Sequence, residues 1–379
     1  MASRTFIVAT LTMAGALVFS SNATVAEPPL GLPPVPVPAD NPMTPEKIAL
    51  GDKLFHDERF SATGDVSCAT CHERDKAFTD SPLKVSEGIN KATGTRNAPT
   101  VINAAFHESQ FWDGREPDLE GQAGQPFLNP VEMALASHQP IVDIVKSDPE
   151  YQELVRAAFD IDPIEVTPDH VVKAIASFER TIISGNSPFD RWYFGGEDDA
   201  ISDQAKRGFE VFLREGRCVS CHTISQNFAL FTDHKFHNLN VGFQRVADDV
   251  VEMAAAYAEA ARNKDEVDID VLTNPASSEL GRFAVDNEYP GLGAFKTPTL
   301  RNVELTAPYM HDGSLETLED VVTHYVNGGA LNEGDPINPY LSGGIRPVDL
   351  SDEQRADLVE FMKSLTSPEF AKLARGAQR

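Results

Sequence analysis

The chain has 379 residues, long enough for two domains of about 100 to 200 residues each. Its 32 Lys and Arg against 58 Asp and Glu give a formal net charge of −26. This surplus argues against nucleic acid or an anionic membrane as a partner, because both are polyanions, and it suits a basic or neutral partner.

The N-terminus predicts a secretory signal peptide over residues 1–26. Arg4 precedes an apolar stretch from Phe6 to about Phe19, and the small residues Thr24 and Ala26 follow. The alternative is a retained membrane anchor, but the apolar stretch is too short to span a bilayer. We therefore expect export to the periplasm and a mature chain without a membrane span. Residues 27–44 are rich in proline and predict an extended leader.

Two later segments have similar sequence patterns. Residues 46–72 and 202–222 each begin as a helix in which a glycine precedes an apolar pair, and each ends in Cys-x-x-Cys-His. The pattern therefore predicts two copies of one module, an N-terminal domain over residues 45–196 and a C-terminal domain over residues 197–379.

The remaining elements are mostly helical. Residues 168–184 have strong helical periodicity, and residues 185–199 resemble a linker by their Gly, Pro and Asp content. Residues 253–268 predict a solvated helix or an inserted excursion. A final helix opens at Ser351, with Gln354 three residues on as in a capping box. Long β-type alternation is absent from the sequence, so we expect a mainly α fold with long loops.

All four cysteines fall in two motifs, Cys68-Ala-Thr-Cys71-His72 and Cys218-Val-Ser-Cys221-His222. This spacing is the attachment pattern of c-type haem, in which the two thiols bind the porphyrin and the histidine binds iron. A zinc site or two short disulfides would explain the cysteines but would leave the histidine after each pair as a coincidence. The sequence thus predicts two covalently bound haem c groups in two cytochrome c-like domains.

Function then depends on the sixth position of each iron, because a protein ligand favours electron transfer and an open face permits chemistry. Side chains that can bind iron occur in both halves, and composition does not show which of them does. On the N-terminal side they are His107, His138 and Met133, and on the C-terminal side His234, His237, Met253, Met310, His311, His324, Tyr325 and Met362.

Two longer runs, QFWDGREPDLEGQAGQPFLNPVEM (110–133) and FKTPTLRNVELTAPYMHDGS (295–314), give the chain a specific resemblance. With the paired haem motifs, they resemble the bacterial di-haem cytochrome c peroxidase and MauG family over nearly the whole mature chain. The resemblance implies catalytic roles at the N-terminal haem for Glu132 as acid–base carboxylate and Gln122 as its polar companion. It also implies that Trp112 lies between the haems and that Asn97, Thr306 and Pro308 help bind one calcium ion.

The chemistry suits Glu132. Peroxide must lose a proton from its near oxygen and gain one at its far oxygen, and one carboxylate within reach of both can carry it. Outside this motif, Glu132 would be interpreted as a solvated or capping carboxylate and Trp112 as a core aromatic.

Two positions separate this chain from the peroxidase branch of the family. That branch closes the N-terminal haem with a histidine, whereas residues 73–106 contain none. The chain resembles MauG here, with Pro126 in the distal pocket and therefore an open face. The branch also uses a Met fourteen residues after the histidine of its PYxHxG motif, a position occupied here by Tyr325, as in MauG.

The change from Met to Tyr has a chemical consequence. A phenolate is hard and anionic and favours ferric and higher iron states, unlike a thioether. The alternatives are that Tyr325 is a packed helix residue with a hydrogen-bonded hydroxyl, or that His324 or Met310 binds the iron. MauG also carries a tryptophan two residues before its second haem motif that relays holes to its protein substrate, and Gly216 stands at this position here.

Three functions follow from these patterns. The first is an exported di-haem peroxidase that reduces hydrogen peroxide, shares oxidising equivalents between its haems and draws electrons from a small redox protein or a protein substrate. The second is a MauG-like enzyme that oxidises tryptophan-type side chains of a partner protein. The third is a non-enzymatic di-haem electron-transfer cytochrome with both irons six-coordinate.

Overall fold

The computed structural model describes residues 27–260, 267–330, 332 and 334–372. The predicted signal peptide, residues 1–26, lies outside this part of the chain, and so does part of the predicted excursion at residues 253–268. Among the helices that the structure describes, none is both long and apolar enough to cross a bilayer.

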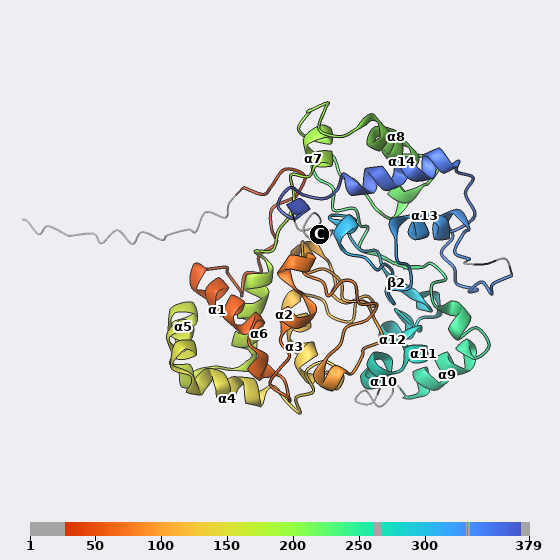
Figure 1. Ribbon diagram of the computed structural model, residues 1–379. Coiled ribbons are helices and arrows are strands. Elements are labelled where there is room, and N and C mark those ends of the chain that lie inside the picture. Colours follow the sequence, from red (N-terminus) through yellow and green to blue (C-terminus); the bar gives the residue numbers. More distant parts are fainter. Residues whose placement is uncertain (1–26, 261–266, 331, 333, 373–379) are drawn as a thin grey trace, which may run out of the picture.

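The fold is mainly helical, as predicted (Figure 1). Two three-residue strands, β1 (Phe236–Asn238) and β2 (Ala294–Lys296), pair antiparallel with Phe236 opposite Lys296. The helices are α1 (Pro45–Phe55), α2 (Cys68–Cys71), α3 (Leu119–Leu128), α4 (Gln139–Ser147), α5 (Pro149–Phe159), α6 (Pro168–Glu179), α7 (Pro188–Tyr193), α8 (Asp203–Leu213), α9 (Val250–Ala260), α10 (Val267–Thr273), α11 (Pro275–Ser278), α12 (Phe283–Asp286), α13 (Leu318–Val326) and α14 (Asp352–Lys363).

Local signals explain where several helices begin. α1 starts at Pro45 behind the N-cap Thr44, whose side chain accepts a hydrogen bond from the Lys47 amide. α14 starts behind Ser351, and the predicted capping box with Gln354 is present. The helix predicted over residues 168–184 is shorter than expected, because α6 ends at Glu179.

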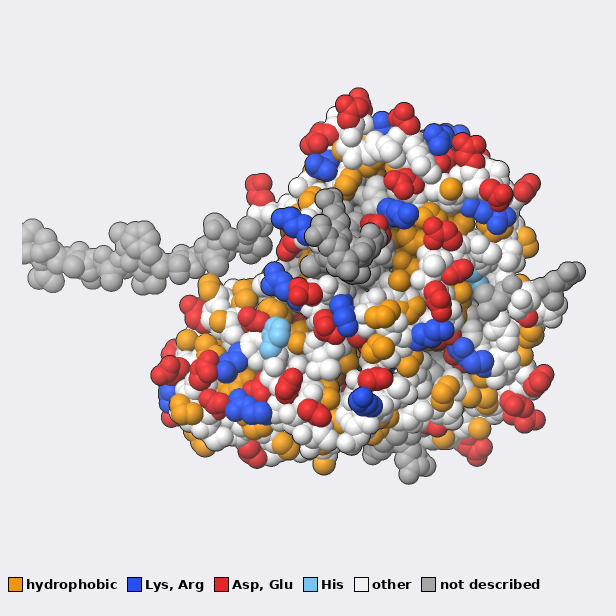
Figure 2. Space-filling model, viewed as in Figure 1, with side chains coloured by type: hydrophobic (Ala, Val, Ile, Leu, Met, Phe, Trp, Pro, Cys, Tyr) orange, Lys and Arg blue, Asp and Glu red, His pale blue; other side chains and the backbone are white. Residues whose placement is uncertain are grey.

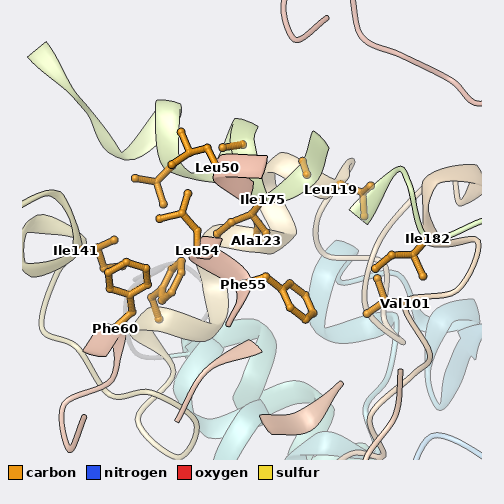
Figure 3. Packing of buried hydrophobic residues seen from close by; sticks show 14 of the residues in the cluster. Leu50, Leu54, Phe55, Phe60, Val101, Leu119, Ala123, Ile141, Ile175 and Ile182 are labelled. Carbon is orange, nitrogen blue, oxygen red and sulfur yellow. The ribbon is translucent and has the colours of Figure 1, made fainter. Parts of the chain in front are cut away.

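The N-terminal core forms where α1 packs on α6 (Figure 3). Leu50, Leu54 and Phe55 of α1 are buried there with Ile175 of α6. The two helices approach closely at Gly51, where a Cβ would overlap the Ala174 carbonyl oxygen of α6. Only glycine permits this approach.

The C-terminal core repeats this crossing with α8 and α14 (Figure 1). A Cβ at Gly208 of α8 would overlap the Asp357 carbonyl oxygen of α14, and Phe361 lies beside it as Phe178 lies beside Gly51. The two glycines singled out in the sequence therefore have the same structural role.

A second repeat, which the sequence analysis missed, follows the haem motifs. Pro99-Thr-Val-Ile-Asn103 matches Pro298-Thr-Leu-Arg-Asn302. The Thr100 hydroxyl donates to the Ala77 carbonyl oxygen at 2.6 Å, and the Thr299 hydroxyl donates to the Leu230 carbonyl oxygen at 2.7 Å. Both asparagines are left-handed, with φ of 64° and 59°.

The repeat continues through a turn into the next helix. Phe111 and Met310 both have positive φ, and the bridges Gln110 to Glu116 and Tyr309 to Leu315 close equivalent turns. α3 and α13 follow directly, and they bury residues at the same helical positions: Leu119, Ala123 and Phe127 in α3, and Leu318, Val322 and Val326 in α13.

The halves meet through a reciprocal pair of backbone hydrogen bonds. The Asn97 amide donates to the His311 carbonyl oxygen, and the Lys296 amide donates to the Trp112 carbonyl oxygen, both at 2.7 Å. Asn97 and Lys296 are equivalent in the repeat, as are Trp112 and His311. The interface is therefore close to two-fold symmetric.

The leader adds a second connection between the halves. The Asn41 amide side chain donates to Glu120 of α3 at 2.7 Å, while the Gly31 carbonyl oxygen accepts from Arg301 at 2.6 Å. Arg301 also forms a buried ion pair with Asp190, 2.8 Å between Nη1 and Oδ2.

The linker predicted at residues 185–199 is wrong in part, because this segment contains α7. Phe189 of α7 is fully buried in the C-terminal core, where it contacts Phe209, Phe231 and Phe361. The buried Phe189 side chain therefore packs this segment into the C-terminal core, although its Gly, Pro and Asp content is typical of a linker. The boundary near Gly196 stays a prediction.

A third cluster lies between the second haem motif and β2. It contains residues of α9 and α12, among them Val250, Ala254, Tyr257 and Phe283. The helix expected from Met253 corresponds to α9, which packs one face into this cluster. Figure 2 shows acidic side chains on both halves of the visible face, interleaved with Lys and Arg.

Candidate haem sites

The two haem-motif histidines have the same orientation. The Nδ1 atom of His72 lies 3.1 Å from the Phe78 carbonyl oxygen, and that of His222 lies 2.8 Å from the Phe231 carbonyl oxygen. A hydrogen bond from Nδ1–H to a carbonyl fixes the ring and leaves Nε2 for a metal. Burial lowers the pKa of both histidines, which favours the neutral form that binds iron.

The C-terminal motif opens onto a cavity of about 550 Å³. Cys218, Cys221 and His222 line one side, and Tyr325 of α13 also lines it. The volume lies within the usual range of roughly 300 to 1,000 Å³ for cofactor pockets, and the lining is mainly apolar. These residues fit a covalently attached haem with two thiols and a histidine on one face.

The N-terminal motif also fits a haem, on different observations. Cys68 packs against the N-terminal core, and burial raises the pKa of both Cys68 and Cys71. The charge of buried Glu179 adds to the raised pKa of Cys68, so this carboxyl lies near the motif. Its Oε2 atom has no hydrogen-bond partner within the described residues. Buried polar atoms without partners are uncommon and are consistent with a missing group beside them.

Glu132 follows α3 in a turn and is partly buried. Its carboxylate accepts a hydrogen bond of 2.5 Å from the Asn129 side chain. Burial raises the pKa of Glu132 to about 7, against the opposing effects of Arg115 and Asn129. Its charge contributes to the raised pKa of the Cys71 thiol, so the carboxyl lies near the N-terminal haem motif. Asn129 was not singled out in the sequence, although it stands in the same run as Glu132.

The other predicted residues of this site lie on α3. Gln122 is partly buried, and its side chain has no hydrogen-bond partner in the described part of the chain, unlike that of Gln125, which donates to Glu116. Pro126 lies inside the helix, one turn further on.

The alternative N-terminal ligands have different surroundings. His138 lies 2.8 Å from the Gly124 carbonyl oxygen through Nε2, and Met133 is buried in the N-terminal core. His107 lies instead near Lys296 and His234 in the other half.

On the C-terminal side, contacts set Tyr325 apart from His324 but not from every other candidate ligand. His324 is buried and its Nε2 atom lies 2.9 Å from the Leu239 carbonyl oxygen, outside the cavity lining. Tyr325 does line the cavity, and burial raises its pKa. Four other candidates also line the cavity, namely His237, Met310, His311 and Met362, whereas Met253 packs with the third cluster.

The internal repeat places Pro126 and Tyr325 at equivalent positions. The separation along the chain between these two residues is the same as that between Asn103 and Asn302. Both stand on the helix that follows the equivalent turn, one residue before a buried Phe127 or Val326. The same helix position thus carries a pyrrolidine ring in one half and a phenol in the other.

The residues expected to bind calcium all belong to the lining of one cavity. Asn97, Thr306 and Pro308 all line the C-terminal cavity, and so does Trp112. The Trp112 indole donates to the Asn97 carbonyl oxygen at 2.9 Å. Trp112 and Asn97 are thus placed at the contact between the halves.

Comparison with known proteins gives a consistent result. A family model described as di-haem cytochrome c peroxidase matches residues 45–199. Methylamine utilization protein MauG of Methylorubrum extorquens is 37% identical over 87% of this chain and 81% of its own length. Cytochrome c551 peroxidase of Nitrosomonas europaea is 35% identical over 85% of this chain and 84% of its own.

A solved structure is also similar. The crystal structure of a MauG-like protein associated with microbial copper homeostasis superposes with a TM-score of 0.74 and 30% sequence identity. The match covers 91% of this chain and 96% of the other.

Proposed function

Because this chain belongs to the di-haem cytochrome c peroxidase family, which includes MauG, we propose that it is an exported enzyme that reduces hydrogen peroxide at its N-terminal haem and stores oxidising equivalents at its C-terminal haem. The two haems occupy two cytochrome c-like domains, residues 45–196 and 197–379. A signal peptide over residues 1–26 directs the chain to the periplasm.

The difference between Pro126 and Tyr325 is the observation that carries this proposal. A proline ring has no lone pair to offer a metal, so Pro126 leaves the distal face of the N-terminal haem open. At the equivalent position, the phenol oxygen of Tyr325 would be available to bind the iron of a haem in the C-terminal cavity. One open and one closed haem is the division expected of a peroxidase that separates reaction from storage.

Glu132 then acts as the proton shuttle at the open face. Reduction of peroxide to two waters consumes two electrons and two protons, and haem iron supplies the electrons when bound. The Glu132 carboxylate accepts a proton from the near oxygen and returns it to the far oxygen. A pKa of about 7 suits both steps, since acid and base forms are then both populated at neutral pH.

Asn129 and Gln122 support this step in different ways. Asn129 donates to the Glu132 carboxylate and fixes its orientation. Gln122, whose side chain is not committed to another group of the described chain, remains able to hydrogen-bond to the bound peroxide. Trp112 lies between the halves and supplies a path between the two haems, and Asn97, Thr306 and Pro308 hold a calcium ion beside it.

Oxidation of a partner protein is the second candidate for the use of the stored equivalents. It is favoured by the 37% identity to MauG and by Pro126 and Tyr325, which match MauG at both positions. Because Gly216 stands where MauG has its relay tryptophan, a partner would be reached by another path. The electron-transfer alternative is weakened because the Nε2 atom of His138 is engaged by the Gly124 carbonyl oxygen.

Mixing the diferric holoprotein with one equivalent of peroxide tests the proposal. We expect a rapid, long-lived change in the haem absorption spectrum, slowed by about 10² to 10⁴-fold in Glu132→Gln, the usual range for loss of acid–base catalysis. Glu87→Gln, at an exposed glutamate, is the control and should react as wild type does. An unchanged wild-type spectrum would refute the peroxidase function.

A further inference from the structure

Lys296 is a buried lysine for which neither the fold nor the proposed chemistry yet accounts. It ends β2 and is 7% exposed. Its Nζ atom donates to the Ser109 carbonyl oxygen at 2.5 Å and lies 3.3 Å from Nδ1 of His107. Lys296 and His107 both line the C-terminal cavity, so the ammonium group is held at the wall of the space where the haem belongs.

The surrounding protein does not neutralise this ammonium group. Burial lowers the pKa of Lys296 to about 7, and the nearby charge that opposes this effect is Asp113. Asp113 is already paired with Arg96 and Arg115, at 2.5 and 3.1 Å. A buried ammonium group without its own anion is costly: it either loses its proton more readily, as the lowered pKa indicates, or pairs with an anion from outside the polypeptide.

Two imidazoles in this region also have a ring nitrogen without a hydrogen-bond partner among the described residues. The Nε2 atom of His107 is buried and has no hydrogen-bond partner among the described residues, and the same holds for Nδ1 of His234. The two rings lie 6.4 Å apart between centroids. Buried nitrogen atoms of this kind normally have a partner. Lys296 and His107 thus stand together at the cavity wall, and His234 lies beside His107 outside the cavity lining.

The internal symmetry points to the same location. Lys296 matches Asn97 in the repeat, and the backbones of these two residues form the reciprocal hydrogen bonds to His311 and Trp112. Asn97 is a proposed calcium ligand. One side of the pseudo-two-fold contact therefore carries the residue that would hold a metal cation, and the other carries an ammonium group.

We propose that Lys296 and His107 bind a propionate carboxylate of the C-terminal haem and so turn the propionate edge of this haem toward the contact between the halves. Haem carries two carboxylates on one edge, which are the anions that this wall lacks. The inference rests on the proposed haem at Cys218 and Cys221, and not on the reaction with peroxide.

The ammonium group has a consequence for the redox chemistry of this haem. A fixed positive charge in a water-poor cavity stabilises the reduced, less positive iron relative to the oxidised iron. Lys296 therefore raises the reduction potential of the C-terminal haem and partly offsets the preference of the Tyr325 phenolate for the ferric state.

Potentiometric titration of the holoprotein, followed by haem absorption, tests this inference. In Lys296→Met, we expect one of the two haem reduction steps to move to lower potential by a tenfold or larger change in the equilibrium constant, about 59 mV for one electron. Lys296→Arg keeps the charge and should stay closer to wild type.

Lys235→Met is the matched control. Lys235 is exposed and directly precedes β1, the strand that pairs with β2, so this variant removes a nearby charge that does not line the cavity. It should leave both reduction steps where they are in wild type.

The inference is overturned if both steps are unchanged in Lys296→Met, or if Lys235→Met moves a step as far as Lys296→Met does. Haem content is measured in parallel, and Lys296→Arg keeps the test valid if the methionine variant does not fold. A potential shift without any peroxide reaction would refute the proposed function alone, and the reverse result would refute the propionate contact alone.

Discussion

In the N-terminal half, α1 crosses α6 at Gly51 and α3 presents Pro126. In the C-terminal half, α8 crosses α14 at Gly208 and α13 presents Tyr325. Both haem-motif histidines are fixed by a backbone carbonyl, so the proximal sides of the two sites are alike. The comparison supports the proposal that two halves with the same helix arrangement can have different functions when the residue at one distal position differs.

The proposed acid–base group also belongs to only one of the two halves. Glu132 stands just after α3, near the N-terminal haem motif. On the C-terminal side, the charged Lys296 lies at the edge of the cavity, near the contact between the halves. In the proposed function, reaction and storage are separated by side chains placed on equivalent backbones.

Exchanging the distal residue is the strongest way to break this comparison. In Pro126→Tyr, we expect the rapid reaction with peroxide to fall on the order of 100-fold or more, as when acid–base catalysis is lost, because a phenol would close the open face. Stopped-flow mixing measures the rate. Gln125→Tyr adds the same side chain at an exposed neighbouring position and should react at nearly the wild-type rate. A fast Pro126→Tyr variant would show that position 126 does not face the haem.

The two helix crossings should respond alike to the same substitution. Gly51→Ala and Gly208→Ala each place a methyl group against a backbone carbonyl oxygen, and overpacking of this kind costs about 1–3 kcal/mol of unfolding free energy or more. Denaturant titration of the holoprotein measures the loss. Gly94→Ala, where the added methyl meets open space, is the control and should change stability by less than about 1 kcal/mol. Tolerance at one crossing alone would break the equivalence of the halves.

The raised pKa of Glu132 predicts a smaller effect on stability. The folded protein holds this proton up to a pH of about 7, whereas the unfolded chain releases it near the ordinary glutamate pKa of 4.5. The folded state therefore binds more protons between these values, and its stability falls as the pH rises through this window. Glu132→Gln should remove this loss and be more stable than wild type at pH 8 by on the order of 1–3 kcal/mol.

Thermal or denaturant unfolding at pH 4 and pH 8 checks this sign. At pH 4 the difference between the two proteins should be small, since the carboxyl is largely protonated in both states. Glu87→Gln should show no such pH dependence. A Glu132→Gln variant that is equally stable relative to wild type at both pH values would contradict the raised pKa.

Much of this organisation could be predicted from the sequence. The haem motifs, the two glycine-bearing helices, the start of α1 at Pro45 and the capping box of α14 all depend on short-range patterns. The segment at residues 185–199 could not be predicted from composition, because Phe189 is held by aromatic partners that are distant in the chain.

The candidate site could likewise be predicted from the sequence only in part. The roles of Glu132, Pro126 and Tyr325 stay predictions from family motifs and counting, and the equivalence of Pro126 and Tyr325 required the second repeat. This repeat is visible in the sequence as two Pro-Thr-x-x-Asn runs. The need for an anion beside Lys296 could not be predicted from the sequence. It arises because Lys296 is buried and because Asp113 is already paired with Arg96 and Arg115.

Electron paramagnetic resonance of the diferric holoprotein tests the division between an open and a closed haem most directly. One high-spin and one low-spin ferric signal are predicted, and Tyr325→Phe should convert the low-spin signal to high spin. Tyr309→Phe, which removes the phenol oxygen of another residue that lines the same cavity, should leave both signals unchanged. Two low-spin signals in wild type, or a low-spin signal that survives Tyr325→Phe, would contradict it.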